Sequence, residues 1–432
     1  MLLARGHADA PVTGDDLDGA IAAIWRIESP RLIATLSRLS RDVARAEDLA
    51  QDAFVAALSQ WPDEGIPHNP GAWLMTTAKR RAIDQIRRNE TLNRLILGSS
   101  VGDLSEPDFA ESYEEIDDDM LRLMFVACHP IVSKEAHVAL TLKLVGGLTS
   151  AEIARAFLVP EGTIAQRIVR AKRTLSDAGV PFDVPSGSDR LQRLASILET
   201  IYLIFNEGYA ATAGDDVLRP ELVEDALRLG RMLAALMPQE REVLGLVALM
   251  EIQASRMRAR VGPAGEPILL LDQDRSRWNR LLIGRGLNAL ARAQELGAAL
   301  GPYGLQAAIA ACHARAGTAE QTDWSRIAAL YDALAQLTPT PVVELNRAVA
   351  VGMAFGPRAG LEIVDPLMRE PSLQKYHLLP AVRADLLFKL GLFEEAKVEF
   401  ERAASMARNS RDQTLLLARA QRCHSELGGE AP

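Results

Sequence analysis

Apolar residues recur along this chain with the 3.6-residue period of an α-helix. Between residues 18 and 60, Leu32, Leu36 and Leu39 share one helix face, and Leu49 and Ala53 share another. Helical spacing resumes at Met120 and, after a further break, covers the chain beyond residue 190. No stretch shows the period-two alternation that a half-buried strand requires. The pattern therefore predicts an all-α protein.

Loop-like stretches interrupt this pattern. WPDEGIPHNPG at 61–71 contains three prolines and two glycines, a composition that ends helices. An acidic stretch begins at Gly98, and SDAGVPFDVPSGSD covers 176–189. We expect a first helical domain at 15–97, an extended or disordered acidic linker at 98–118, a second helical domain at 119–178, a helical extension at 190–300 and tetratricopeptide-like helical repeats at 301–428.

The net charge of −9 is unevenly distributed. Residues 1–178 contain 20 Lys and Arg against 26 Asp and Glu, a net charge of −6. Nine of these acidic residues lie between 103 and 119 with no basic residue among them, and without them the same region is +3. Two basic helical segments are thus separated by an acidic one. These nine are Asp103, Glu106, Asp108, Glu111, Glu114, Glu115, Asp117, Asp118 and Asp119.

One basic segment follows the capping-box pattern of Thr149 and Glu152 and the turn LVPEG. In the helix VPEGTIAQRIVRAKRTL (159–175), one face is apolar and the other is polar and basic. This arrangement is typical of a helix-turn-helix domain, in which Arg pairs with guanine or phosphate and Gln with adenine. A solvated amphipathic helix is the alternative. The apolar positions are Ile164, Ile168, Ala171 and Leu175, and the polar positions are Thr163, Gln166, Arg167, Arg170 and Arg173.

The other basic segment is KRRAIDQIRR, which closely follows Trp73. An ordinary exposed helix face would alternate its charges, whereas only Asp84 interrupts this run. Its basic residues are suited to neutralising phosphates, and they are Lys79, Arg80, Arg81, Arg87 and Arg88.

Together these segments resemble the extracytoplasmic-function (ECF) sigma factors of bacterial RNA polymerase. Residues 46–58, AEDLAQDAFVAAL, are similar to region 2.2, and 72–88 to regions 2.3 and 2.4. Residues 133–175 are similar to region 4, and order and spacing agree across 28–178. YLIFNEGY, LLLDQDRSRW and the tail resemble the subgroup with a long C-terminal extension that ends in tetratricopeptide-like repeats.

The resemblance implies that core RNA polymerase and promoter DNA are the partners. Asp48, Gln51 and Asp52 share a helix face by their spacing and would bind core polymerase. Trp73, Lys79, Arg80, Arg81, Arg87 and Arg88 would bind the minus-ten element. Arg155, Pro160, Thr163, Gln166, Arg167, Arg170 and Arg173 would bind the minus-thirty-five element. Within these sets we expect Gln166, Arg167 and Arg170 to recognise bases, and Lys79, Arg87 and Arg88 mainly to bind phosphate.

Two positions depart from the family pattern. Many members have Asn where this chain has Arg80, and many have a basic residue and Ser where it has Ala165 and Gln166. Base recognition at Arg80 and the sequence of the upstream element are therefore expected to differ from the family's commonest pattern. The acidic linker would thread the basic cleft of polymerase as a mimic of nucleic acid, or would act only as a solvated spacer.

The extension has the pattern of helix pairs packed in series. Residues 382–404 carry small residues at Ala384, Gly391, Ala396 and Ala403 between larger ones. Such arrays present a groove to a protein or peptide partner; a stabilising appendage without a ligand is the alternative. We expect the extension to regulate the sigma domains, so that truncation near Pro185 changes transcription more than stability.

No enzyme, cofactor or metal site is predicted. Cys128, Cys312 and Cys423 form no CxxC pair, and adjacent Cys128 and His129 chelate poorly. The polar clusters at 206–209 and 272–280, which include Glu207, Asp272 and Asp274, would form an enzyme-like pocket or, as we expect, an internal hydrogen-bond network.

Apolar runs such as LGLVALM are too short to cross a bilayer, and the N-terminus lacks the apolar core of a signal peptide. We therefore expect a cytoplasmic protein without membrane contact. The hypothesis is a sigma factor with a fused regulatory module. The alternatives are a helix-turn-helix regulator that acts without core polymerase, and a tetratricopeptide interaction scaffold with a degenerate sigma module.

Overall fold

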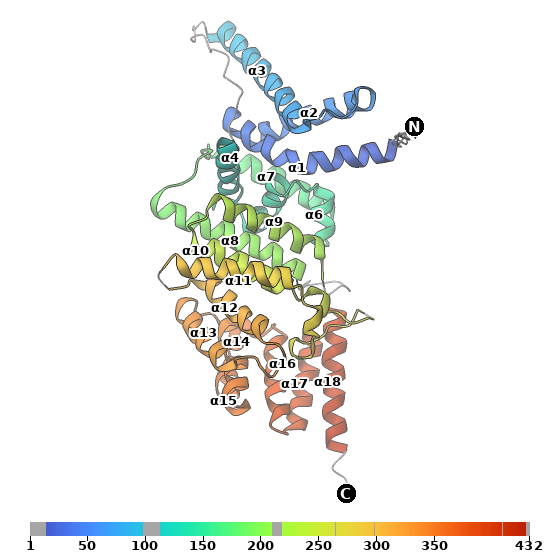
Figure 1. Ribbon diagram of the computed structural model, residues 1–432, viewed down its shortest axis with the longest axis vertical. Coiled ribbons are helices and arrows are strands. Elements are labelled where there is room, and N and C mark those ends of the chain that lie inside the picture. Colours follow the sequence, from blue (N-terminus) through green and yellow to red (C-terminus); the bar gives the residue numbers. More distant parts are fainter. Residues whose placement is uncertain are drawn as a thin grey trace, which may run out of the picture. The chain divides into compact units, whose positions relative to one another are not determined.

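The computed structural model describes residues 14–97, 113–209, 218–263, 265–297, 299–407 and 409–428 (Figure 1). Its regular elements are helices, and the described residues add only an isolated bridge between Val261 and Pro267. The predicted all-α class is confirmed. The chain divides into two compact units, Met1–Thr200 and Ile201–Pro432.

The first unit begins with α1 (Gly14–Ser40), α2 (Val43–Glu64) and α3 (Pro70–Leu97). The Asp42 carboxylate caps α2, because its Oδ1 accepts hydrogen bonds from the backbone N–H groups of Ala44 and Arg45 at 2.8 and 3.0 Å. The predicted faces pack a common core that includes Leu32, Leu36, Leu49, Trp61 and Leu74. Leu39 is an exception to its predicted face, because it is 38% exposed near the end of α1.

The same unit continues with α4 (Tyr113–Ala127), α5 (Lys134–Leu140), a π-helical segment η1 (Thr141–Val145), α6 (Ser150–Ala156) and α7 (Glu161–Asp177). The predicted capping box is present at the start of α6, where the Thr149 hydroxyl accepts from the Glu152 N–H and the Glu152 carboxylate accepts from the Thr149 N–H. Leu158, at φ +50°, lies in the turn between α6 and α7.

The acidic linker is shorter than predicted, because α4 already begins at Tyr113. The Asp119 side chain is fully buried and accepts hydrogen bonds from Arg38 at 2.9 Å and from Arg122 at 2.7 Å. Asp119 therefore anchors α4 to α1 and is not part of an extended nucleic-acid mimic. Residues 98–112 lie outside the described residues.

Helix α8 (Gly187–Tyr209) crosses the division between the units. Its first part belongs to the first unit, where Lys134 pairs with Glu199 at 2.5 Å and Cys128 Sγ lies 3.6 Å from Thr200 Oγ1. Truncation near Pro185 would therefore remove packing from the first unit as well as the extension. The predicted boundary at residue 190 falls inside α8 and stays a prediction.

The second unit is a series of helices in which each member from α12 to α18 packs against the next. Serial packing is what the repeat pattern predicts, and the tetratricopeptide-like identity of the pairs stays a prediction. The elements are α9 (Pro220–Leu236), α10 (Arg241–Ala254), η2 (Met257–Ala259), η3 (Leu270–Asp272), η4 (Arg275–Arg277), α11 (Arg280–Glu295), α12 (Pro302–Arg315), α13 (Trp324–Leu337), α14 (Pro341–Phe355), α15 (Pro357–Leu367), η5 (Pro371–Leu373), α16 (Leu378–Lys389), α17 (Phe393–Met406) and α18 (Ser410–Gly428).

Helices α14 and α15 approach closely at Gly360, where an added Cβ would lie 2.9 Å from the Ala348 carbonyl oxygen. We expect Gly360→Ala to destabilise the second unit by about 1–3 kcal/mol through overpacking. Gly284→Ala in α11 is the matched control, because nothing lies within 4 Å of its Cβ, and it should stabilise the helix by about 0.5–1 kcal/mol. Denaturant titration measures both changes, and equal effects of the two substitutions would contradict the close packing.

Candidate functional site

One face of α2 is polar and exposed. Asp48, Gln51 and Asp52 all lie on it, as their i, i+3, i+4 spacing predicts, while Leu49 and Ala53 are buried beneath. Val55 is 58% exposed one turn further along the same face, and the sequence analysis did not select it. The i, i+3, i+7 spacing from Asp48 through Gln51 to Val55 would have found it. The face combines carboxylates with an apolar position, a composition suited to binding a basic protein surface.

Two residues of this face make contacts within the first unit. Arg81 Nη1 donates a hydrogen bond to the Asp52 carbonyl oxygen at 2.5 Å and lies 3.9 Å from its carboxylate. Gln51 Nε2 donates to Glu47 Oε1 at 3.2 Å. Asp48 makes no ion pair within the described residues, so its charge is available to a partner.

Helix α3 separates residues that the sequence analysis grouped together. Arg80 is exposed, but Lys79 is only 5% exposed and Arg81 is engaged with Asp52. Consecutive helical residues are about 100° apart, so Lys79, Arg80 and Arg81 cannot all occupy one face. The role of Lys79 as a phosphate contact stays a prediction for a side chain that is largely buried in this structure.

Trp73 is half-buried, with its ring edge against buried Trp61 at a centroid distance of 5.4 Å. Its position near the start of α3 is thus fixed by packing. The side chains of Arg87 and Arg88, which were also predicted to bind DNA, lie outside the described residues.

Helix α7 has the predicted two faces. Its apolar residues Ile164, Ile168, Ala171 and Leu175 are buried. Its polar residues are exposed except for half-buried Arg167, and Arg173 lies 3.4 Å from Asp177 on the same helix. Arg155 of α6 and Pro160 are exposed too, and Pro160 occupies the N-cap position of α7. Buried apolar packing thus leaves a continuous polar surface for Thr163, Gln166, Arg170 and Arg173.

A contact between α2 and the second helical domain was not predicted. Glu47 is buried, and its carboxylate lies 2.6 Å from Lys172 Nζ of α7 and 3.6 Å from Lys143 Nζ of η1. The Ser176 hydroxyl donates to Asp42 Oδ2 at 2.7 Å. The sequence carried one signal, because Glu47 lies four residues after Val43 and three before Ala50 on the buried face of α2. A carboxylate at such a position requires a cationic partner.

The pKa of the Asp42 carboxyl reflects this contact. Burial alone would raise the pKa of Asp42, but hydrogen bonds from the Arg45 N–H, the Ser176 hydroxyl and the Ala44 N–H outweigh it and lower the pKa below its ordinary value. The charged form of Asp42 is therefore the one that both caps α2 and holds the end of α7.

The polar clusters of the second unit form an internal network. Arg275 is buried and donates hydrogen bonds to the carbonyl oxygens of His313 and Ala316, both at 2.7 Å, and to Thr322 Oγ1 at 3.0 Å. Burial and the charges of Arg256 and Arg275 lower the pKa of His313 to about 4, so its ring is neutral at physiological pH. The internal-network interpretation of residues 272–280 is confirmed for Arg275.

The 206–209 cluster is held in the same manner. Glu207 pairs with Arg219, and Arg260 lies over the Tyr209 ring, 3.7 Å from its centroid, while donating to the Tyr209 carbonyl oxygen. These side chains serve packing within the second unit.

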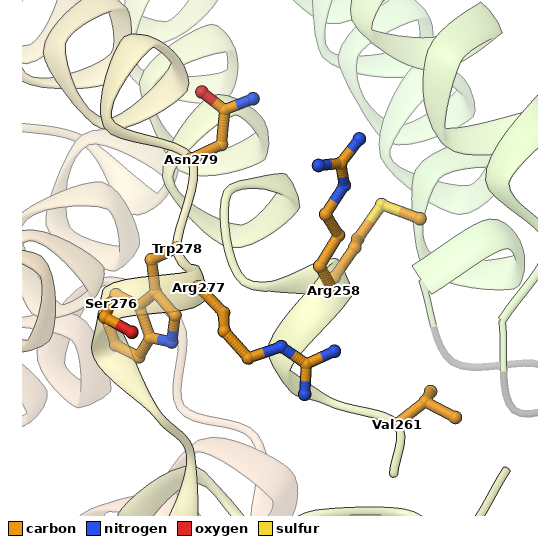
Figure 2. Close-up of a pocket in the computed structure, with 7 residues that line it drawn as sticks. Arg258, Val261, Ser276, Arg277, Trp278 and Asn279 are labelled. Carbon is orange, nitrogen blue, oxygen red and sulfur yellow. The ribbon is translucent and has the colours of Figure 1, made fainter. Parts of the chain in front are cut away.

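A cavity of about 720 Å³ adjoins this network. Figure 2 shows Arg277 extending toward Val261, with Arg258 on the facing segment and the buried Trp278 ring at one wall. Met257, Ser276 and Asn279 complete the lining. Asn279 caps α11 through its side-chain oxygen, so much of this wall has a structural role.

Cys128 and His129 show no sign of joint ligation. Burial raises the pKa of the Cys128 thiol to about 11, which keeps it protonated. Within the described ranges, no group of three or more His, Cys, Asp or Glu side chains is arranged to hold a metal ion. No helix among the same residues is both long and apolar enough to cross a membrane.

Comparison with protein families gives matches to three segments of the chain. Residues 24–91 match sigma-70 region 2, and residues 122–175 match sigma-70 region 4. A relative named "ECF RNA polymerase sigma factor SigL" is 30% identical to the chain, which covers 88% of that protein. The chain belongs to the ECF sigma factors. Residues 193–294 of this sigma factor match a family of unknown function, DUF6596, which falls within the predicted extension. The region 2 match disfavours a regulator that acts through helix-turn-helix binding alone.

Comparison with individual relatives supports the same family. The sigma domains are 30% identical over 168 residues to "ECF RNA polymerase sigma factor SigL" of Mycobacterium tuberculosis, covering 38% of this chain and 88% of that protein. They are 26% identical over 176 residues to "ECF RNA polymerase sigma factor SigK" of Mycobacterium ulcerans, covering 40% and 87%. "Uncharacterized protein R00370" of Rhizobium meliloti is 42% identical over 386 residues, or 88% of this chain and 90% of that protein. Because this match covers most of both chains, the sigma domains and the extension occur together in this relative.

Arg80 of α3 is exposed and its neighbour Lys79 is buried, so we expect substitutions at the two positions to have different effects. Arg80→Ala should reduce the slope of log K against log salt concentration by about 0.9 for DNA carrying a minus-ten sequence, because one phosphate contact is lost. Lys79→Ala should leave that slope unchanged and lower stability instead, because the side chain is buried. Fluorescence anisotropy over a salt series measures the slope. A reduced slope for Lys79→Ala would show that Lys79 binds phosphate despite its burial in this structure.

Proposed function

We propose that the exposed face of α2 binds core polymerase through Asp48, Gln51 and Asp52, with Val55 as its apolar contact. The support is that these four side chains are exposed together on one helix whose opposite face is buried in the domain. A rigid helix face with complementary charge favours fast and specific association. The exposure of these four side chains on one face of α2 is the observation that supports the proposed polymerase-binding site.

Promoter recognition is divided between two helices in this proposal. Arg80 and Arg81 of α3, beside Trp73, bind the minus-ten element. The exposed face of α7, supported by Arg155 and Pro160, binds the minus-thirty-five element through Thr163, Gln166, Arg167, Arg170 and Arg173. The support is the exposed polar face of α7, which is the helix that a helix-turn-helix domain inserts into the major groove.

The extension is proposed to regulate these activities by binding a protein or peptide segment. Serially packed helices are the observation that supports this role. The chain would act beside polymerase in the cytoplasm as an initiation factor, with no catalytic activity of its own.

Charge reversal on α2 tests the docking face. We expect Asp48→Lys to weaken binding to core polymerase by about 2 kcal/mol, or roughly 30-fold in Kd, because a cation would replace a contacting carboxylate. Asp48 is preferable to Asp52, whose contact with Arg81 would also be disturbed. Glu64→Lys is the matched control, since it changes the same charge at an exposed position on another face of α2.

Binding is measured by titrating labelled chain with purified core polymerase. Unchanged affinity of Asp48→Lys, or equal loss in Glu64→Lys, would show that this face does not dock polymerase.

Two substitutions in α7 separate base recognition from phosphate binding. Gln166→Ala should relax preference at one base pair by about 1–3 kcal/mol. Arg173→Ala, which lies outside the set expected to recognise bases, should weaken binding to all sequences alike and reduce the salt slope by about 0.9. Binding to a library of single-base promoter variants distinguishes the patterns. An unchanged preference profile for Gln166→Ala would remove that residue from the recognition set.

A further inference from the structure

The cavity beside η2 and η4 in the second unit is lined by two cations and by no carboxylate. Its lining includes Arg258 of η2 and Arg277 of η4, but no Asp or Glu. Both arginines are exposed, and neither makes an ion pair within the described residues. Hydrogen bonds from Ser276 and the charge of Arg277 lower the pKa of Asp274, but Asp274 is not among the lining residues. The two guanidinium groups are therefore available to an anion.

Further positive charge lies behind one wall of the cavity. This wall is the ring of Trp278, which is 3% exposed. The guanidinium carbons of Arg256 and Arg275 lie 5.8 and 5.1 Å from its centroid. Arg275 is near the exposed carboxylate of Glu320, whereas Arg256 makes no ion pair in the part of the chain that the structure describes. Four arginines thus surround this wall, and their summed field favours a negatively charged ligand.

The cavity also combines a hydrogen-bond donor with apolar surface. Trp278 Nε1 is buried without a hydrogen-bond partner among the described side chains and backbone, and Figure 2 shows it on the side of the ring along which Arg277 extends. Met257, Val261 and the indole ring supply the apolar surface. Guanidinium groups match the paired oxygens of carboxylates and phosphates. The volume of about 720 Å³ is that of a small-molecule site.

The two segments that carry the arginines are held in place by other residues. Arg275 anchors η4 through its hydrogen bonds to backbone carbonyl oxygens. The Asn279 N–H donates to the Ser255 carbonyl oxygen at 2.9 Å, which joins the end of η4 to the segment before η2. Neither Arg258 nor Arg277 takes part in these contacts. The walls are thus organised before a ligand binds, which lowers the cost of binding one.

We propose that this cavity binds a small organic anion, whose carboxylate or phosphate group is held by Arg258 and Arg277 and whose apolar body packs against Trp278. The inference goes beyond the proposed binding of a protein or peptide segment by the extension. It does not depend on the proposed contacts with polymerase or DNA.

Calorimetric titration of the full chain in a phosphate-free buffer tests the proposal. The probes are phenyl phosphate, phenylacetate and phenylacetamide, which share a ring and differ in charge. We expect at least one of the two anions to bind at a single site about tenfold or more tightly than neutral phenylacetamide, because it gains a charge-assisted hydrogen bond. The order of phenyl phosphate and phenylacetate identifies which anionic group the cavity prefers.

Two further probes test the apolar part of the site. Inorganic phosphate and acetate carry the anionic group without a ring. Each should bind about tenfold or more weakly than the preferred ring-bearing anion, because it buries no apolar surface against Trp278 and Val261. Equal affinity of the preferred anion and its ringless counterpart would show that the cavity does not select an organic anion.

Substitution of single arginines locates the site. Arg258→Gln and Arg277→Gln should each weaken binding of the preferred anion by about tenfold or more, with the affinity for phenylacetamide unchanged. Arg285→Gln is the matched control, because it removes the same charge from an exposed position of α11 outside the lining, and it should change the affinity by less than about twofold. All three positions are exposed, so the fold should be retained, which circular dichroism checks.

Three results would overturn the proposal. They are the absence of saturable binding by both anions up to about 10 mM, equal affinity for phenylacetamide and the preferred anion, and equal affinity of Arg277→Gln and Arg285→Gln for that anion. The titration contains neither polymerase nor DNA, so its result is independent of the proposed function of α2, α3 and α7.

Discussion

A carboxylate withdrawn from water requires a cationic partner, and Glu47 finds both of its partners in another domain. Burying an ion pair gains little free energy by itself, but separating one is costly because each charge is then left without compensation. The arrangement of the first unit follows from this asymmetry. Helix α2 presents a docking face outward while its buried side is connected to α7, so any event that moves one helix affects the other.

The side chains of helix α7 face three different surroundings. Its apolar stripe packs into its own domain, its exposed stripe is polar and basic, and Lys172 lies between them toward α2. A helix offers about 100° of rotation per residue, so these surfaces can be set independently by neighbouring residues. The second unit is built differently, with small residues at helix contacts and an internal arginine network at Arg275. Helix α8 is continuous across the division between the two units.

Local spacing predicted much of this structure. The capping box of Thr149 and Glu152, the two faces of α7 and the shared face of Asp48, Gln51 and Asp52 depend on residues within two helical turns. The contact of Glu47 with Lys172 joins residues separated by 125 positions, so periodicity alone could not identify the partners of Glu47. A run of basic residues does not indicate which of its members face solvent, and Lys79 is buried. The α4 start at Tyr113 was missed because acidic composition masked a helix that Arg38 and Arg122 stabilise at Asp119.

The account depends on the contact between Glu47 of α2 and Lys172 of α7 being present in the free chain in solution. Fluorescent labels at Glu64→Cys on α2 and Asp183→Cys after α7, both exposed positions, would report the distance between the domains by single-molecule energy transfer. The account predicts one short distance in the free chain, and a longer mean distance in Glu47→Gln, which removes the carboxylate that both lysines contact. An equally long distance in the free chain would contradict it.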